Sequence, residues 1–69
     1  MLKPQEMVRA LKKADFEELR QVGSHLVLVN RATKKVTTVP LHSGDLNRNT
    51  MKEIIKQSGF SEEEFRIFL

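Results

Sequence analysis

Apolar residues recur at intervals of three and four in the first part of the chain. Met7, Val8, Leu11 and Ala14 share this spacing, while the charged residues Arg9, Lys12 and Lys13 fall at other positions. Pro4 is well placed as a first helical residue, because its fixed φ angle suits a helix and its missing amide is not needed there. The pattern predicts an amphipathic helix of about three turns that begins at Pro4.

The middle of the chain changes to strand-like patterns. We expect three strands, over residues 16–22, 25–31 and 36–39. The run Leu26–Val29 is apolar on both alternating faces, which is typical of a central strand or of one whose second face a partner covers. Asp15 provides a turn before the first strand, residues 32–35 form a hairpin tip, and Pro40 stops the last strand because it has no amide to donate. Together these strands predict a small antiparallel sheet.

Helical signals return after a loop over residues 41–49. Thr50 begins a second helix as its cap, with Glu53 three residues later to complete a capping box. Gly59 ends that helix, and Ser61 with Glu64 repeats the capping box. A second helix and a short final helix are therefore expected.

The chain is long enough for one small domain. With 69 residues it can bury a single core, and without cysteine it has neither disulfides nor a thiolate zinc site to supplement that core. No apolar run approaches the ~20 residues that span a bilayer, so we expect a cytoplasmic protein without membrane contact. The pattern predicts one α+β domain over residues 1–69, with helices on one face of a three-stranded antiparallel sheet.

The tripeptide Gly23-Ser24-His25, directly before the apolar strand, is the leading candidate for chemistry. Glycine turns the backbone where other residues clash, and a strand end holds a side chain more rigidly than a loop does. Because imidazole exchanges its proton close to neutral pH, His25 could be a general base toward a ribose 2′-hydroxyl, with no metal or other cofactor. Ser24 could hold the imidazole or a phosphate oxygen. The alternative is an ordinary turn before a partly exposed histidine, which spacing alone favours.

Positive charge is concentrated around this candidate. Between Leu19 and Lys52 the chain has six basic residues and one acidic residue, a net charge of +5. The basic residues are Arg20, Arg31, Lys34, Lys35, Arg48 and Lys52. Such a segment would attract the backbone of a nucleic acid, and Arg20, Lys34 and Lys35 are the candidates for that contact. The same composition is also typical of loops that charge keeps soluble.

A second polar cluster, His42-Ser43-Gly44-Asp45, follows the predicted sheet. His42 and Asp45 could join His25 as metal ligands, although no spacing typical of a metal site supports this. His42 could instead be a general acid, or the cluster could be a turn with local hydrogen bonds, which is the interpretation the residue types favour. The chain contains no phosphate-binding loop, dinucleotide-binding motif or nucleophile elbow, which argues against those enzyme classes.

Taken together, these residues resemble the HicA family of toxin mRNA interferases over almost the whole chain. The Gly23-Ser24-His25 element is the most specific part, accompanied by Pro40, His42 and a helix from Thr50 to Gly59. The resembling segments are residues 7–16, 20–25, 39–46 and 50–61. Asp15 stands where relatives usually have glycine, and aspartate tolerates turn geometry better than most other residues.

The resemblance implies a fold like that of the double-stranded RNA-binding domain, α-β-β-β-α, here with a short extra C-terminal helix. It also implies the toxin of a type II toxin–antitoxin system, an endoribonuclease that cleaves mRNA. His25 matches the catalytic histidine of the family, and His42 matches a recurrent loop histidine. A HicB-type antitoxin that covers the active site is the implied protein partner.

Two other functions remain open from the sequence. A binding module of the same fold would hold RNA without cutting it, and its effects would not depend on His25. A small interaction subunit would use its apolar sheet face and the terminal Phe68-Leu69 for protein contacts alone. It would show no salt-dependent RNA binding, whereas phosphate contacts weaken as salt rises.

Overall fold

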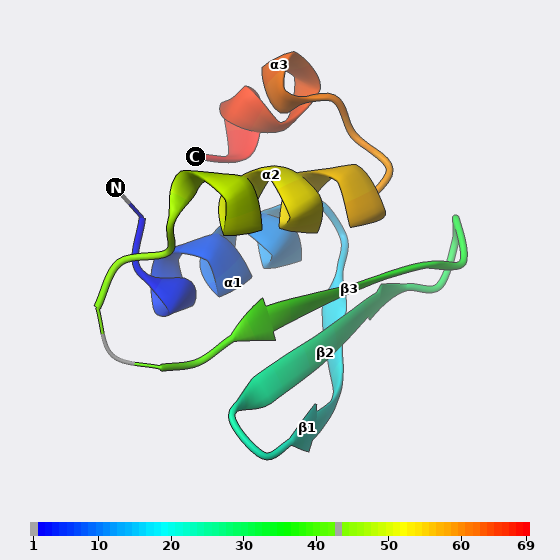
Figure 1. Cartoon of the computed structure of the whole chain (residues 1–69). Coiled ribbons are helices and arrows are strands. Elements are labelled where there is room, and N and C mark those ends of the chain that lie inside the picture. Colours follow the sequence, from blue (N-terminus) through cyan, green and yellow to red (C-terminus); the bar gives the residue numbers. More distant parts are fainter. Residues whose placement is uncertain (1, 43) are drawn as a thin grey trace.

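The computed structural model describes residues 2–42 and 44–69. The elements in chain order are α1 (Pro4–Lys13), β1 (Glu17–Val22), β2 (His25–Asn30), β3 (Lys35–Pro40), α2 (Arg48–Gln57), α3 (Glu62–Phe65) and the 3₁₀ helix η1 (Arg66–Phe68). The strands form one antiparallel sheet in the order β1-β2-β3, and the helices gather on one side of it (Figure 1). This confirms the predicted α+β fold, with its α-β-β-β-α order and a short extra helix near the C-terminal end. Within the described ranges, every helix is too short or too polar to cross a membrane.

The core lies between the helices and one face of the sheet. Leu26 and Leu28 of β2 and Val39 of β3 face the helices and are almost fully buried, as are Met7 and Leu11 of α1. The residues that alternate with them in β2 stay partly exposed on the other face, which we call the open face of the sheet. No helix in the described part of the chain covers this face (Figure 1). β2 is thus the central strand, as its two apolar faces predict.

The cap of the second helix lies three residues earlier than its sequence pattern predicts. α2 begins at Arg48, and Asn47 is its cap: the Asn47 side-chain oxygen accepts a hydrogen bond of 2.8 Å from the Thr50 amide. The prediction that Thr50 caps the helix is therefore wrong. The burial of Leu46 explains the difference. Because its side chain is completely buried, Leu46 fixes the position at which the chain enters the helix, and the residue after it, Asn47, becomes the cap. Glu53 consequently lies one turn inside the helix and does not cap it.

Three other local predictions can be compared with the structure. Asp15 has a φ of 72°, the turn conformation that aspartate was expected to tolerate. Ser61 and Glu64 form the predicted capping box, with hydrogen bonds of 2.8 Å and 3.1 Å between each side chain and the other residue's amide. β3 extends one residue beyond its predicted end: Pro40 is its last residue and pairs with His25 at the end of the strand pairing. This pairing is what brings the end of β3 beside the candidate histidine.

Candidate functional site

Gly23 and Ser24 form a two-residue turn between β1 and β2, flanked by the paired residues Val22 and His25. Gly23 has a φ of 60° whereas Ser24 has no positive φ, and a positive φ at the first turn residue alone is typical of a type II′ hairpin turn. An added Cβ there would meet no atom within 4 Å, so the backbone angle and not space favours glycine. The Leu41 amide donates a hydrogen bond of 2.6 Å to the Ser24 carbonyl. The turn is therefore tied to the end of β3, which fixes the backbone of His25.

The exposed side chain of His25 lines a groove of about 390 Å³ beside the outer edge of β3. Thr38 and Pro40 form one wall with it, because the register places these residues on the open face together with His25. The opposite wall consists of α2 residues, namely Asn49, Thr50, Glu53, Ile54 and Gln57. We call this the His25 groove. Its volume lies within the ~300–1,000 Å³ that is usual for ligand pockets.

The helix wall of the groove was missed by the sequence analysis. Its polar row is Asn49, Glu53 and Gln57, at intervals of four residues. Beside it runs a basic row of exposed residues, Arg48, Lys52 and Lys56. The spacing of four was visible in the sequence, but the assignment of Glu53 to a cap at Thr50 hid it. The groove therefore sets hydrogen-bonding groups opposite an imidazole, with positive charge on the next row of the same helix.

Arg20 shares the open face with His25 because of a β-bulge. β1 pairs Glu18 with Leu28 but Arg20 with Val27, so one extra residue lies between the two pairs. A shift of one residue moves a side chain to the other face of a sheet; without the bulge, Arg20 would face the helices. The register instead places Arg20 diagonally from His25, an arrangement in which side chains lie roughly 7–8 Å apart. The structure thus brings one predicted cation to the candidate base.

Lys34 and Lys35 lie at the opposite end of the hairpin from His25. Lys35 pairs with Asn30, five residues along β2, which is about 17 Å at about 3.3 Å per residue. The side chain of Asn30 accepts hydrogen bonds from two amides of this tip. Nearby, Arg31 forms an ion pair with Glu17. The basic segment is therefore divided between the His25 end and the hairpin tip.

The second predicted cluster is described only in part. His42 is exposed and lies two residues beyond Pro40, which pairs with His25. Gly44 has a φ of 91°, a backbone conformation found in turns, while Ser43 lies outside the described residues. Across residues 2–42 and 44–69, no three His, Asp or Glu side chains come together as a group that could hold a metal ion.

A family model described as the HicA toxin of bacterial toxin–antitoxin systems matches residues 4–60. The matched range runs from α1 to just past α2, and it includes the Gly23-Ser24-His25 turn and both walls of the His25 groove. α3 and η1 follow after it. No curated protein sequence matches the chain.

Proposed function

The chain belongs to the HicA family of bacterial toxins, and on that premise we propose that it is an endoribonuclease that cleaves mRNA with His25 as the general base. Its role is that of a toxin with a partner antitoxin. The observation that supports the nuclease proposal is the position of His25, fixed at a strand end by the Gly23-Ser24 turn and exposed in a groove with polar walls. mRNA in the cytoplasm is the proposed substrate.

In the proposed reaction, the His25 imidazole takes the proton from a ribose 2′-hydroxyl. The 2′-oxygen then forms a bond to the adjacent phosphorus, and the bond from phosphorus to the 5′-oxygen of the next nucleotide breaks. That oxygen leaves with a proton from water or from His42. The products are one end with a 2′,3′-cyclic phosphate and one with a 5′-hydroxyl, and no metal is required.

Charged and polar groups around His25 support this chemistry. Arg20, on the same face, would offset the negative charge that builds on the phosphate as the new bond forms. The Glu53 carboxylate lines the same groove and would stabilise the imidazolium formed when His25 takes the proton. The Thr50 hydroxyl, on the same wall, would donate to a phosphate oxygen.

The open face of the sheet is the proposed site of inhibition. It carries the half-buried Val27 and Val29 of β2, and Val22 and Val36 beside them are 57% and 47% exposed. Grouped apolar residues on an exposed face mark an interaction site, because a partner that covers them removes their surface from water and so stabilises the complex. We propose that a HicB-type antitoxin packs on this face and closes the His25 groove to RNA.

The test is a cleavage assay of the purified chain and its His25→Ala variant with end-labelled RNA in EDTA. We expect the parent chain alone to cut, and its fragments to carry a 2′,3′-cyclic phosphate. Equal cutting by both proteins would exclude His25 as the base. If the folded parent binds RNA but leaves it intact, with EDTA and with Mg²⁺ restored, the chain is an RNA-binding module and not a nuclease.

A further inference from the structure

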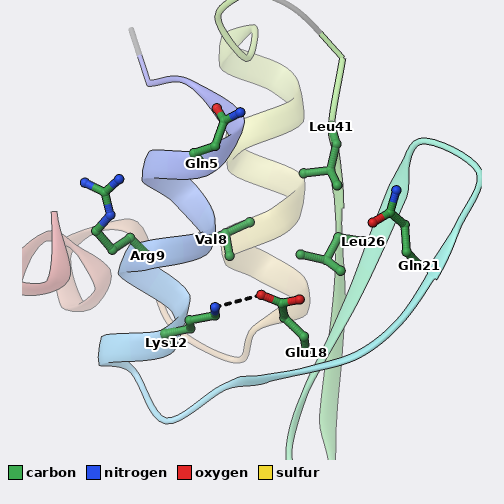
Figure 2. A pocket seen from close by; sticks show the side chains of 8 residues that line it. All are labelled: Gln5, Val8, Arg9, Lys12, Glu18, Gln21, Leu26 and Leu41. Atoms are coloured by element: carbon green, nitrogen blue, oxygen red, sulfur yellow. Dashed lines mark ion pairs between the residues drawn. The ribbon is translucent and has the colours of Figure 1, made fainter.

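A second pocket, also of about 390 Å³, lies between α1 and the strands. Val8 of α1, Leu26 of β2 and Leu41 after β3 point toward one another and form its apolar floor (Figure 2). Gln5 and Gln21 stand at its rim on opposite sides. The remaining lining residues are Arg9, Lys12 and Glu18. We call this cavity the α1–β1 pocket.

The pocket exists because the sheet extends beyond the helices at β1. Every residue of β1 is exposed, and the helices pack against β3 instead. Glu18 and Gln21 pair with Leu28 and Leu26, so both occupy the face of the sheet that bears the helices. Two polar side chains thus stand where a core residue would otherwise fill the space. At one end, Lys12 and Glu18 close the pocket with an ion pair of 2.7 Å.

The Gln21 side chain is held in one orientation by the turn that carries His25. Its amide nitrogen donates a hydrogen bond of 3.0 Å to the Gly23 carbonyl. Because a carbonyl can only accept, the nitrogen must face the turn and the amide oxygen must face the other way. Figure 2 shows that oxygen directed toward the pocket. The pocket therefore has a fixed hydrogen-bond acceptor, and this acceptor is tied to the Gly23-Ser24 turn.

The pocket and the side chain of His25 lie at the same end of the sheet, on opposite faces. Leu26 follows His25 in β2, and successive residues of a strand point to opposite faces. Leu41 follows Pro40, the residue that pairs with His25. The Gly23-Ser24 turn joins the strand end that carries Gln21, at the pocket, to His25, in the groove. A single-stranded chain that crosses the turn would reach both.

We propose that the α1–β1 pocket binds one unpaired base of the RNA whose backbone lies at His25. This inference rests on the proposed function. A base is a flat ring with polar edges: the aliphatic floor would contact its faces, and Gln21 would accept a hydrogen bond from an N–H at its edge. The charge of the lining agrees with a polyanion, because Lys12 and Glu18 offset each other and Arg9 leaves one positive charge. The pocket thus selects the nucleotide near the cut.

The test uses NMR of the full chain with His25→Ala, so that RNA is not consumed, and with labelled Val and Leu methyl groups. The probe is a six-nucleotide RNA, and its control is the same RNA with one base removed. Gln5→Trp fills the pocket from an exposed helix position, and Gln5→Ala is its matched control. We expect the Val8, Leu26 and Leu41 methyl signals to shift with intact RNA. Gln5→Trp should weaken binding about tenfold, within the range for loss of one base contact, and Gln5→Ala less than about threefold.

Two results would contradict the proposal that the pocket binds a base and would leave the nuclease proposal intact. In the first, RNA shifts the signals around Arg20 but not the pocket methyl groups, and Gln5→Trp binds as tightly as the parent. In the second, the methyl shifts persist after the base is removed, so that sugar or phosphate causes them. If RNA shifts no signal and the unaltered chain cleaves no RNA, the proposed function itself fails, and the pocket proposal fails with it.

Discussion

The two faces of β2 serve different purposes although their residues alternate along one strand. Toward the helices, Leu26 and Leu28 are 6% and 0% exposed and belong to the core. Toward the other side, His25 is exposed and Val27 is half-buried, with Arg20 opposite Val27. The first set stabilises the fold, and the second is available to RNA or to a partner. In this small domain, changes to stability and changes to activity should therefore separate at adjacent positions of one strand.

The largest effect on stability should come from the covered face. Leu28→Ala removes a fully buried side chain from the core and should lower the free energy of unfolding by about 3 kcal/mol. Val27→Ala, at the next position of the same strand, should cost roughly 1 kcal/mol. Urea unfolding of both variants measures the difference. Equal losses would show that the open face is packed as tightly as the core.

Two neighbouring threonines of β3, Thr37 and Thr38, face opposite sides of the sheet in the same way. Thr37 is 1% exposed, and its hydroxyl lies 3.0 Å from the Ile54 carbonyl and 3.2 Å from the Gln57 side-chain oxygen, either of which can accept its proton. Thr37→Val should therefore cost about 1–2 kcal/mol. Thr38→Val, on the open face, should leave stability within about 0.5 kcal/mol. Thermal unfolding separates them, and a Thr38 variant that is the less stable would contradict the assignment of faces.

The cap of α2 offers a test outside the sheet. Asn47→Ala should lower stability by about 1 kcal/mol, because the Thr50 amide loses its acceptor. Thr50→Ala should leave stability unchanged or raise it by a few tenths of a kcal/mol (about 0.5 at most), because Thr50 lies inside the helix, where alanine has the higher helix propensity. Chemical denaturation compares the two. The reverse order would restore the helix start that the sequence pattern predicts and would move the helix wall of the His25 groove.

The smallest effect concerns charge on the open face. Arg20→Gln should weaken RNA binding by about fivefold and reduce the slope of log affinity against log salt by about 0.7, as expected for one lost contact to single-stranded phosphate. Lys13→Gln, on α1, removes the same charge from the helix layer and should change the slope much less. Fluorescence anisotropy over a salt series gives both slopes. Equal slopes would place the RNA elsewhere.

Most of the fold follows from the sequence because its local signals agree with one another. The helical spacing in α1, the two apolar faces of β2 and the capping box at Ser61 each correspond to the element that forms. Asp15 adopts the positive φ expected of a turn residue. The start of α2 could not be predicted from the local sequence, because asparagine and threonine are both good helix caps. The burial of Leu46 decides in favour of Asn47 over Thr50.

The candidate site was predictable only in part. The Gly23-Ser24 turn and the strand position of His25 come from residues adjacent in sequence, so a local pattern is sufficient. Arg20 reaches the open face through a bulge, and neighbouring residues do not determine where a bulge forms. The polar row of α2 meets His25 only through the packing of that helix against β3, which is a long-range contact.

The central claim is that His25 acts in chemistry and not in folding, and one paired measurement on His25→Ala tests it most directly. The rate of RNA cleavage in EDTA and the free energy of unfolding are measured on the same preparation. We predict that the rate falls by 10²–10⁴-fold, as for loss of a general base, while stability changes by less than about 0.5 kcal/mol. An unchanged rate, or a loss of rate fully explained by unfolded protein, would contradict the claim.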